Sequence, residues 1–330
     1  MKKISELIQK KPGLTLFIIL ILMSAVIYLS YSTIKMKTNY VILDEKMNLF
    51  ENKFELLSPS IARMETEDFL EKQKYYNVNY RSLKQQVITE LAKHPDEKYG
   101  FYFEDLATGS WIGINEKERF IPRSLFKVPL MVLILKKVEE GELSLDQKVI
   151  VKPADLLGVE LETIVLTEYE TTIGELIAKM IQESDNAAVS ILINKFIVVE
   201  DYVKIVSTMG LPTPLEDYSV SPKEYANIFR SLYLSTYLRR PFSELALTIL
   251  LDTKFNSQLP AGLPKDVKIS HKVGFDKNLG FYHDCGIVYL PEHPYLICIM
   301  SQDNTQENAD EMMSSLSKIV YEYNAKIMEG

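Results

Sequence analysis

Ser124-Leu125-Phe126-Lys127 opens the most informative stretch of this chain, because the apolar run of residues 128–135 follows it directly. A hydroxyl and an amine three residues apart on a helix lie one turn apart on the same face. A desolvated, neutral lysine in that position can take the proton of the serine and make it a nucleophile. The pair alone is better explained as a helix start with an ordinary solvated lysine, so a second motif has to decide.

Composition excludes several classes of function. At 330 residues the chain is long enough for one large domain or two. A net charge of -8 and the lack of a basic stripe argue against nucleic acid as a partner. The four histidines show no zinc-ligand spacing and no phosphate-binding loop is present, so we expect neither metal nor cofactor. Cys285 and Cys298 lie in consecutive apolar segments, and we expect two small buried side chains rather than a disulfide framework.

Residues 13–31 are uncharged and predominantly apolar, and their length nearly matches the hydrocarbon core of a bilayer. More lysines precede this stretch than follow it, which predicts a cytoplasmic tail, residues 1–12, and an exported body. The alternative is a cleaved signal peptide. The stretch is long for one, and Ser30-Tyr31-Ser32 is a poor cleavage site. The pattern therefore favours an uncleaved, single-pass transmembrane anchor with an extracytoplasmic catalytic domain.

Residues 32–80 predict a helical stalk and a linker. Between positions 43 and 61, apolar residues follow one another at alternating distances of four and three positions. This spacing indicates an amphipathic helix, although Pro59 interrupts it. Two interpretations remain open: a short helix packed on the main domain, or a stalk that forms a homodimer. Residues 65–80 are mostly polar and charged, which is typical of a linker.

The body, residues 81–330, alternates helical and strand patterns. Period-two and apolar runs predict strands at the following positions: 99–103, 111–114, 268–272, 284–290 and 295–300. Helical periodicity predicts helices at 83–91, 173–180, 187–197, 225–238, 243–251 and 307–324, besides the one that follows Ser124. Strands at both ends with helices between them predict an α+β fold, with an antiparallel sheet assembled from distant segments.

Two further motifs follow the serine helix. Ser184-Asp185-Asn186 lies between two predicted helices, where a hydroxyl can relay a proton and an amide can bind a substrate carbonyl or amide. Such a triplet is also a normal N-cap. Lys272-Val273-Gly274 is predicted to end a strand, where glycine permits close approach and lysine offers positive charge to an anionic substrate group.

In this order, S-x-x-K, S-D-N and K-[ST]-G mark class A β-lactamases and penicillin-binding proteins. The chain resembles that superfamily of penicillin-recognising serine hydrolases over roughly residues 81–326, and its class A branch most nearly. The resemblance implies an antiparallel sheet flanked by helices together with an all-helical subdomain. It also implies a β-lactam or a peptidoglycan-like small molecule as substrate.

The resemblance implies four catalytic residues. Ser124 would attack the lactam or peptide carbonyl and become acylated, and Lys127 would be its general base or part of the proton relay. Ser184 would pass the proton to the leaving nitrogen. Lys272 would support that relay and attract the substrate carboxylate.

Three more residues would bind substrate by the same resemblance. Asn186 would hold the substrate's side-chain amide, and Gly274 would admit the substrate to the strand. The backbone N–H groups of Ser124 and Phe275 would form the oxyanion hole, which typically contributes about 3 to 4 kcal/mol.

The sequence departs from the family at two places. Val273 stands where serine or threonine is usual and cannot donate a hydrogen bond to a substrate carboxylate. Class A enzymes carry a deacylating glutamate before Ser221, followed four residues later by asparagine. Here Glu216 is the one glutamate in that loop, and Val220 follows it four residues on, so Glu216 is either this base or a solvated turn carboxylate. His283-Asp284 either lines the site or caps a strand, and we favour the structural role.

Three functions remain. The first is a membrane-anchored serine hydrolase that forms a Ser124 acyl-enzyme and hydrolyses β-lactams, at a slow rate if the loop lacks its base. The second is a penicillin-binding D,D-peptidase or transpeptidase that acts on peptidoglycan, which fits the missing glutamate. The third is an inactive extracytoplasmic domain used for sensing or as a scaffold.

Overall fold

The computed structural model describes residues 79–156, 168–212, 218–291 and 293–329. All described residues belong to one compact unit. The predicted anchor at 13–31, residues 32–78 of the predicted stalk and linker, and Glu216 lie outside the described residues. Within those ranges no helix has both the length and the apolar character that a membrane crossing requires.

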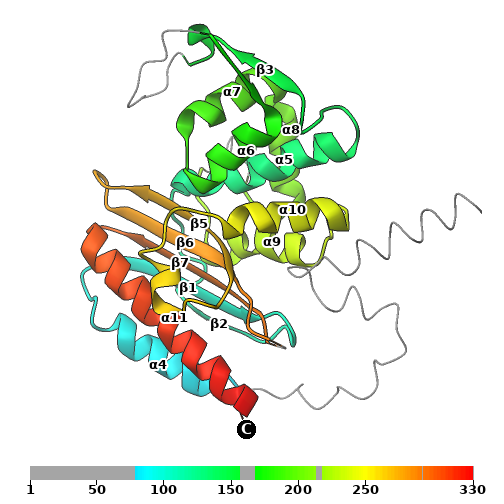
Figure 1. Ribbon diagram of the computed structural model, residues 1–330. Helices are drawn as coiled ribbons and strands as arrows, with labels where there is room; N and C mark the ends of the chain where they lie inside the picture. Colours follow the sequence, from blue (N-terminus) through cyan, green and yellow to red (C-terminus); the bar gives the residue numbers. More distant parts are fainter. Residues whose placement is uncertain (1–78, 157–167, 213–217, 292, 330) are drawn as a thin grey trace, which may run out of the picture. The chain divides into compact units, whose positions relative to one another are not determined.

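A five-stranded antiparallel sheet in the order β2-β1-β7-β6-β5 forms the centre of the described body (Figure 1). Its strands are β1 (Lys98–Asp105), β2 (Trp111–Ile114), β5 (Ile269–Asp276), β6 (Phe281–Val288) and β7 (Tyr295–Gln302). The N-terminal hairpin pairs with the last strand, so that Lys98 lies opposite Gln302 and Asp105 opposite Tyr295. This confirms the predicted α+β fold and the joining of distant segments. One boundary was wrong: β5 continues past Gly274 to Asp276 rather than ending at the third motif.

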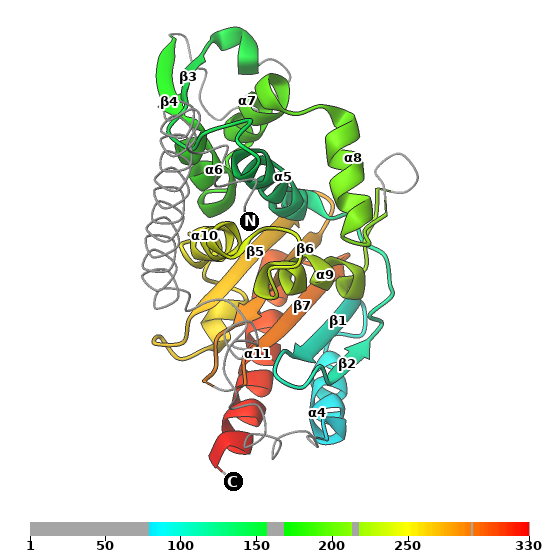
Figure 2. The same ribbon diagram turned by 90° about the vertical axis from the view of Figure 1, so that its right-hand side faces the viewer.

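Helices cover both faces of the sheet (Figures 1 and 2). On one face lie α4 (Arg81–Leu91) and α11 (Gln306–Glu329), whose apolar side chains join Phe101, Phe103 and Ile297 in a hydrophobic core cluster. On the other face α9 (Pro222–Tyr233) and α10 (Arg240–Leu251) pack on the central and edge strands. Because neither face meets water, all eight residues of β6 are buried. That double burial explains the nearly continuous apolar runs in the sequence.

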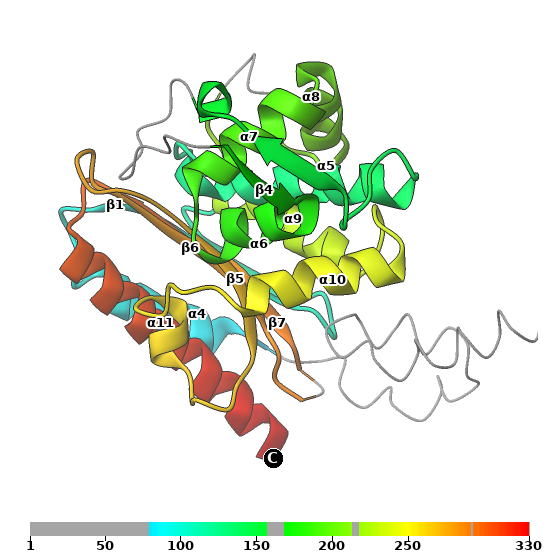
Figure 3. The ribbon, with the colours of Figure 1, turned by 45° about the horizontal axis from the view of Figure 1, so that its top comes forward.

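Apart from η5 (Leu259–Gly262), which packs on α11, the remaining helices pack together on the α9–α10 side of the sheet (Figure 3). They are η3 (Arg123–Phe126), α5 (Lys127–Glu139), η4 (Pro153–Leu156), α6 (Ile173–Gln182), α7 (Asn186–Phe196) and α8 (Val199–Thr208). A capping box of Thr172 and Glu175 fixes the start of α6, because each satisfies an orphan backbone N–H of the other. Helix α8 and the two-stranded sheet of β3 (Lys148–Val151) and β4 (Tyr169–Thr172) were not predicted. The subdomain is therefore helical with a small sheet rather than all-helical.

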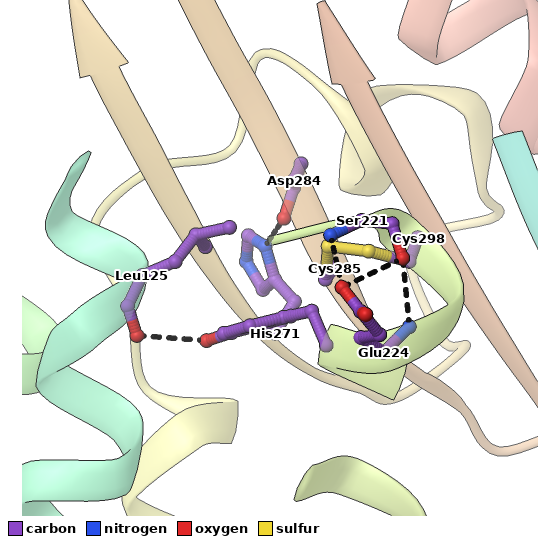
Figure 4. Close-up of a disulfide and its surroundings, with 8 residues drawn as sticks. Leu125, Ser221, Glu224, His271, Asp284, Cys285 and Cys298 are labelled. Carbon is purple, nitrogen blue, oxygen red and sulfur yellow. Dashed lines mark hydrogen bonds and ion pairs between the residues drawn. A yellow bond between two sulfur atoms is a disulfide. The ribbon is translucent and has the colours of Figure 1, made fainter. Parts of the chain in front are cut away.

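The two cysteines are buried as predicted, but they form a disulfide, so the expectation of unpaired thiols was wrong. Cys285 on β6 lies directly opposite Cys298 on β7, which brings two side chains thirteen positions apart in sequence into contact (Figure 4). Register between neighbouring strands decides this pairing. The hairpin signal at residues 291–294 indicated that the strands are neighbours but did not fix which residues face each other.

Candidate active site

Ser124 lies in a single 3-10 turn, η3, just before helix α5 rather than on the helix itself. Neighbouring elements hold the backbone of this turn. Tyr225 of α9 donates a hydrogen bond to the carbonyl of Leu125 at 2.9 Å. On β6, His283 Nε2 donates to the carbonyl of Ile121 at 2.9 Å, and burial lowers the pKa of His283 to about 4. A neutral imidazole therefore supports the turn, and the serine is positioned by sheet and helix together.

The opposite side of the site is the turn between α6 and α7 that carries the second motif. Asp185 caps α7 by accepting from the N–H groups of Ala187 and Ala188, at 2.6 and 3.0 Å. Ser184 has a φ of +56°, a left-handed conformation that costs a non-glycine residue roughly 1 to 3 kcal/mol. The N-cap interpretation of the motif thus holds for Asp185. Ser184 is left to face the two lysines.

Lys127 is the first residue of α5 and its side chain has no exposed surface. Its Nζ donates to the carbonyl oxygen of Ser184 at 2.5 Å, to Ser184 Oγ at 3.1 Å and to Asn186 Oδ1 at 2.8 Å. Three acceptors match the three N–H groups of an ammonium, whereas a neutral amine keeps two and exposes a lone pair. Among the described residues, Lys127 Nζ thus donates to Ser184 and Asn186 of the second motif and forms no hydrogen bond with Ser124 Oγ.

Lys272 reaches the same hydroxyl from the sheet. Its Nζ donates to Ser184 Oγ at 3.1 Å and to the carbonyl oxygen of Val273 at 3.1 Å, and it is also fully buried. Ser124, Ser184 and Lys272 are separated by 60 and 88 residues in the sequence. The fold nevertheless makes Ser184 Oγ the common partner of Lys127 and Lys272.

Burial makes both amines weak bases. It lowers the pKa of Lys127 to about 8, with the Asp185 carboxylate opposing the shift. Burial first, and then the charge of Lys127, lower the pKa of Lys272 to about 7, with Asp284 opposing. Neutral oxygens alone accept from the two amines, so no carboxylate bond restores their charged forms. Near neutral pH the two amines are therefore not both fully charged. A general base requires such a neutral amine.

Gly274 allows the edge strand to approach the turn that carries Ser124. A Cβ at this position would lie 2.7 Å from the carbonyl oxygen of Pro122 and 3.2 Å from the backbone nitrogen of Leu125. Both are backbone atoms, so any larger residue would push the strand and the turn apart. Phe275 follows on the same strand and is partly exposed, beside the site. Val273 is buried and presents no polar group.

His283 and Asp284 are both buried and both structural. Asp284 accepts from His271 Nδ1 at 2.8 Å and from the backbone N–H of Leu259 at 3.1 Å, so both of its carboxylate oxygens bond within the protein (Figure 4). Neither His271 nor Tyr225 was predicted from the sequence to lie near the site, because only packing brings them there. No group of three or more metal-ligating side chains occurs in the part of the chain that the structure describes.

Comparisons with known proteins agree with this geometry. The model of a family described as "Beta-lactamase enzyme family" matches residues 82–324. The chain is 24% identical over 256 residues to beta-lactamase SME-1 of Serratia marcescens, covering 70% of this chain and 86% of that protein. It is 27% identical to beta-lactamase ROB-1 of Haemophilus influenzae over 245 residues, which cover 68% of this chain and 78% of that protein.

Solved structures give the same result. The structure of PBP-A superposes with a TM-score of 0.66 at 25% identity, covering 74% of this chain and 97% of that one. A variant of PBP-A, solved as an acyl-enzyme complex with penicillin G, gives the same values. A beta-lactamase from Chitinophaga pinensis shares the fold with a TM-score of 0.66 at 22% identity, covering 74% of this chain and 99% of that one.

Proposed function

The chain belongs to the beta-lactamase enzyme family, and on that premise we propose that it is a serine hydrolase in which β-lactams acylate Ser124. The observation that carries the proposal is the meeting of two buried, weakly basic lysines on Ser184 Oγ, beside the turn that holds Ser124. Burying two lysines without a carboxylate partner is costly, and such groups occur mainly where chemistry needs them.

The acylation step follows from this arrangement. The neutral amine of Lys127 accepts the proton of Ser124 Oγ, and the oxygen forms a bond to the lactam carbonyl carbon. The carbonyl oxygen becomes an oxyanion held by the backbone N–H groups of Ser124 and Phe275. When the C–N bond breaks, Ser184 gives its proton to the leaving nitrogen and regains one from Lys127. Lys272 supports Ser184 by its hydrogen bond to the same oxygen.

A second candidate function is that of a penicillin-binding peptidase or transpeptidase with a long-lived acyl-enzyme. The carboxylates described around the site are engaged elsewhere: Asp185 caps α7, Asp276 pairs with Arg123 at 3.3 Å, and Asp284 bonds to His271. Glu216, proposed as a deacylating base, is outside the described residues. The likeness to PBP-A at 25% identity supports this candidate as well.

We further propose that residues 13–31 anchor the chain in a membrane, with residues 1–12 in the cytoplasm and residues 81–330 as an exported hydrolase domain. The excess of lysines before the apolar stretch supports this orientation. The buried Cys285–Cys298 disulfide supports an oxidising compartment for the body. Protease added to intact cells should remove the body, and a body that stays protected contradicts the orientation. The stalk at 32–80 as a dimer contact is tested by crosslinking in the membrane.

The test of acylation is covalent labelling of the full chain by a fluorescent penicillin. We expect wild type to be labelled and Ser124→Ala to remain unlabelled. Ser207→Ala, which removes an exposed hydroxyl from α8, is the matched control and should label like wild type. Loss of label within seconds indicates a β-lactamase, and persistence for many minutes a penicillin-binding peptidase. Absence of label in wild type at high probe concentration would instead establish an inactive domain.

A further inference from the structure

A cavity of about 140 Å³ lies along β5, directly after the lysine of the third motif. Val273 and Phe275 of β5, Tyr282 of β6 and Asp310 of α11 contribute to its wall, together with Phe255 and Gln258 from the segment before β5. Tyr282 pairs with Phe275 across the two strands, and α11 packs on that face of the sheet. The cavity is therefore built from four separate parts of the described chain.

This cavity lies beside the candidate active site. Lys272 Nζ lies 5.4 Å from the centre of the Phe255 ring, and the Phe255 and Phe275 rings are 5.9 Å apart. The same amine bonds to Ser184 Oγ at 3.1 Å. An acyl donor that binds against Phe275 at the edge of β5 therefore places the part beyond its reacting carbonyl beside these two rings. The substituent on that part contacts the wall of the cavity.

The wall includes two buried, unpartnered hydrogen-bond acceptors, among polar residues that also include Ser257, Lys277 and Gln306. Gln258 is 6% exposed, and its Oε1 is buried without a hydrogen-bond partner among the described residues. Asp310 Oδ1 is likewise buried and unpartnered within the described chain. A flip of the Gln258 side-chain amide exchanges its oxygen and its NH2 group, whereas both carboxylate oxygens of Asp310 are acceptors in either case. Val273 provides no hydroxyl donor. The wall therefore has two acceptors that bond to no described residue, which suits a donating group.

Charge decides between a neutral and a charged group. The carboxylate of Asp310 disfavours a substrate carboxylate beside it. Lys277, the one cationic side chain among the residues that line the cavity, is exposed and disfavours a second cation. Burial and then the carboxylates of Asp310 and Asp276 raise the pKa of Tyr282, which is consistent with a negative potential on this wall. A neutral hydrogen-bond donor is repelled neither by the Asp310 carboxylate nor by the Lys277 ammonium.

We propose that this cavity binds a carboxamide, so that the enzyme accepts amidated acyl donors in preference to those that carry a free carboxylate at this position. Gln258, Val273 and Asp310 determine this specificity. The inference rests on the proposed acylation of Ser124 and names its class of substrate. The carboxamide N–H groups donate to Gln258 Oε1 and Asp310 Oδ1, which turn toward the cavity when it is filled.

The test compares penicillin G with its carboxamide on the full chain. The second-order rate of Ser124 acylation is measured by intact-mass spectrometry, and each rate is divided by that probe's hydroxide hydrolysis rate to remove intrinsic reactivity. We expect the normalised carboxamide rate to equal or exceed that of the acid. In Val273→Thr/Asp310→Asn the ratio of carboxamide to acid should fall about tenfold, because a donor is gained and a repelling charge is lost. Glu311→Gln removes a neighbouring exposed charge outside the cavity and should leave the ratio unchanged.

The outcomes separate this inference from the proposed function. If wild type prefers the acid, or if the double variant and Glu311→Gln give the same ratio, the inference is overturned while acylation stands. If neither probe acylates Ser124, the proposed function itself is overturned. Should the double variant fail to fold, the single variant Gln258→Leu tests the same inference. It should slow the carboxamide about tenfold and leave the acid unaffected, since one acceptor is lost, and equal slowing of both refutes the inference.

Discussion

The protonation of Lys127 should control the pH dependence of acylation. Its pKa is lowered to about 8, so about 1% of the amine is neutral at pH 6 and about 90% at pH 9. Only the neutral amine can take the proton of Ser124. The acylation rate with a penicillin should therefore rise about 90-fold over this range and reach a plateau above pH 9. Because Lys127 and Lys272 are coupled, the midpoint belongs to the pair rather than to one residue.

Asp185→Asn tests the electrostatic part of this reasoning. The Asp185 carboxylate raises the pKa of Lys127 against the larger effect of burial. Asparagine can still accept the hydrogen bonds from Ala187 and Ala188 that cap α7, so the fold should be kept. Removing the charge should move the midpoint of the rate profile to lower pH. Glu200→Gln, an equal change of charge on the exposed start of α8, should leave the midpoint in place.

The assay is stopped-flow or rapid-quench acylation between pH 5.5 and pH 9.5, with Ser124→Ala correcting for hydroxide attack on the probe. A flat profile would refute Lys127 as the base. A midpoint that moves upward in Asp185→Asn, or that moves equally in Glu200→Gln, would refute the assigned role of the Asp185 charge.

Three further predictions concern the frame of the site. Gly274→Ala should slow acylation at least about tenfold and lower the melting temperature, because its Cβ would lie 2.7 Å from the carbonyl oxygen of Pro122; Gly174→Ala, a helical site with more room, is the control, and equal effects would count against the argument. Reducing the Cys285–Cys298 disulfide should lower the free energy of unfolding by about 3 kcal/mol for a loop of this length, measured by urea titration with and without reductant; an unchanged midpoint contradicts it. Burial depresses the folded-state pKa of Lys272 to about 7, below its unfolded value, so the unfolded chain binds more protons between about pH 7 and pH 10.5 and stability should rise with pH in that window. Lys272→Met should flatten this slope, and a slope as steep as that of wild type would show that the lysine is not its source.

Short-range patterns in the sequence predicted most of the architecture. The helical face before residue 94, the 99–103 and 111–114 hairpin strands and the closing helix all appear in the structure. Elements whose stability depends on their neighbours were missed. Strands β3 and β4 are four residues each and pair only with one another, so neither carries a long periodic signal. The extension of β5 to Asp276 depends on its pairing with β6.

For the site, sequence alone determined which residues are candidates for the chemistry, because S-x-x-K, S-D-N and K-V-G are local patterns whose order is specific. What those residues contact was decided by the tertiary structure. Lys127 bonds to Ser184 and Asn186 rather than to the serine one turn before it. Lys272 meets the same hydroxyl, and Cys285 faces Cys298 because two strands pair in one register. The physical reason is burial: a side chain's pKa and its partners depend on what excludes water from it, and segments distant in sequence supply that cover.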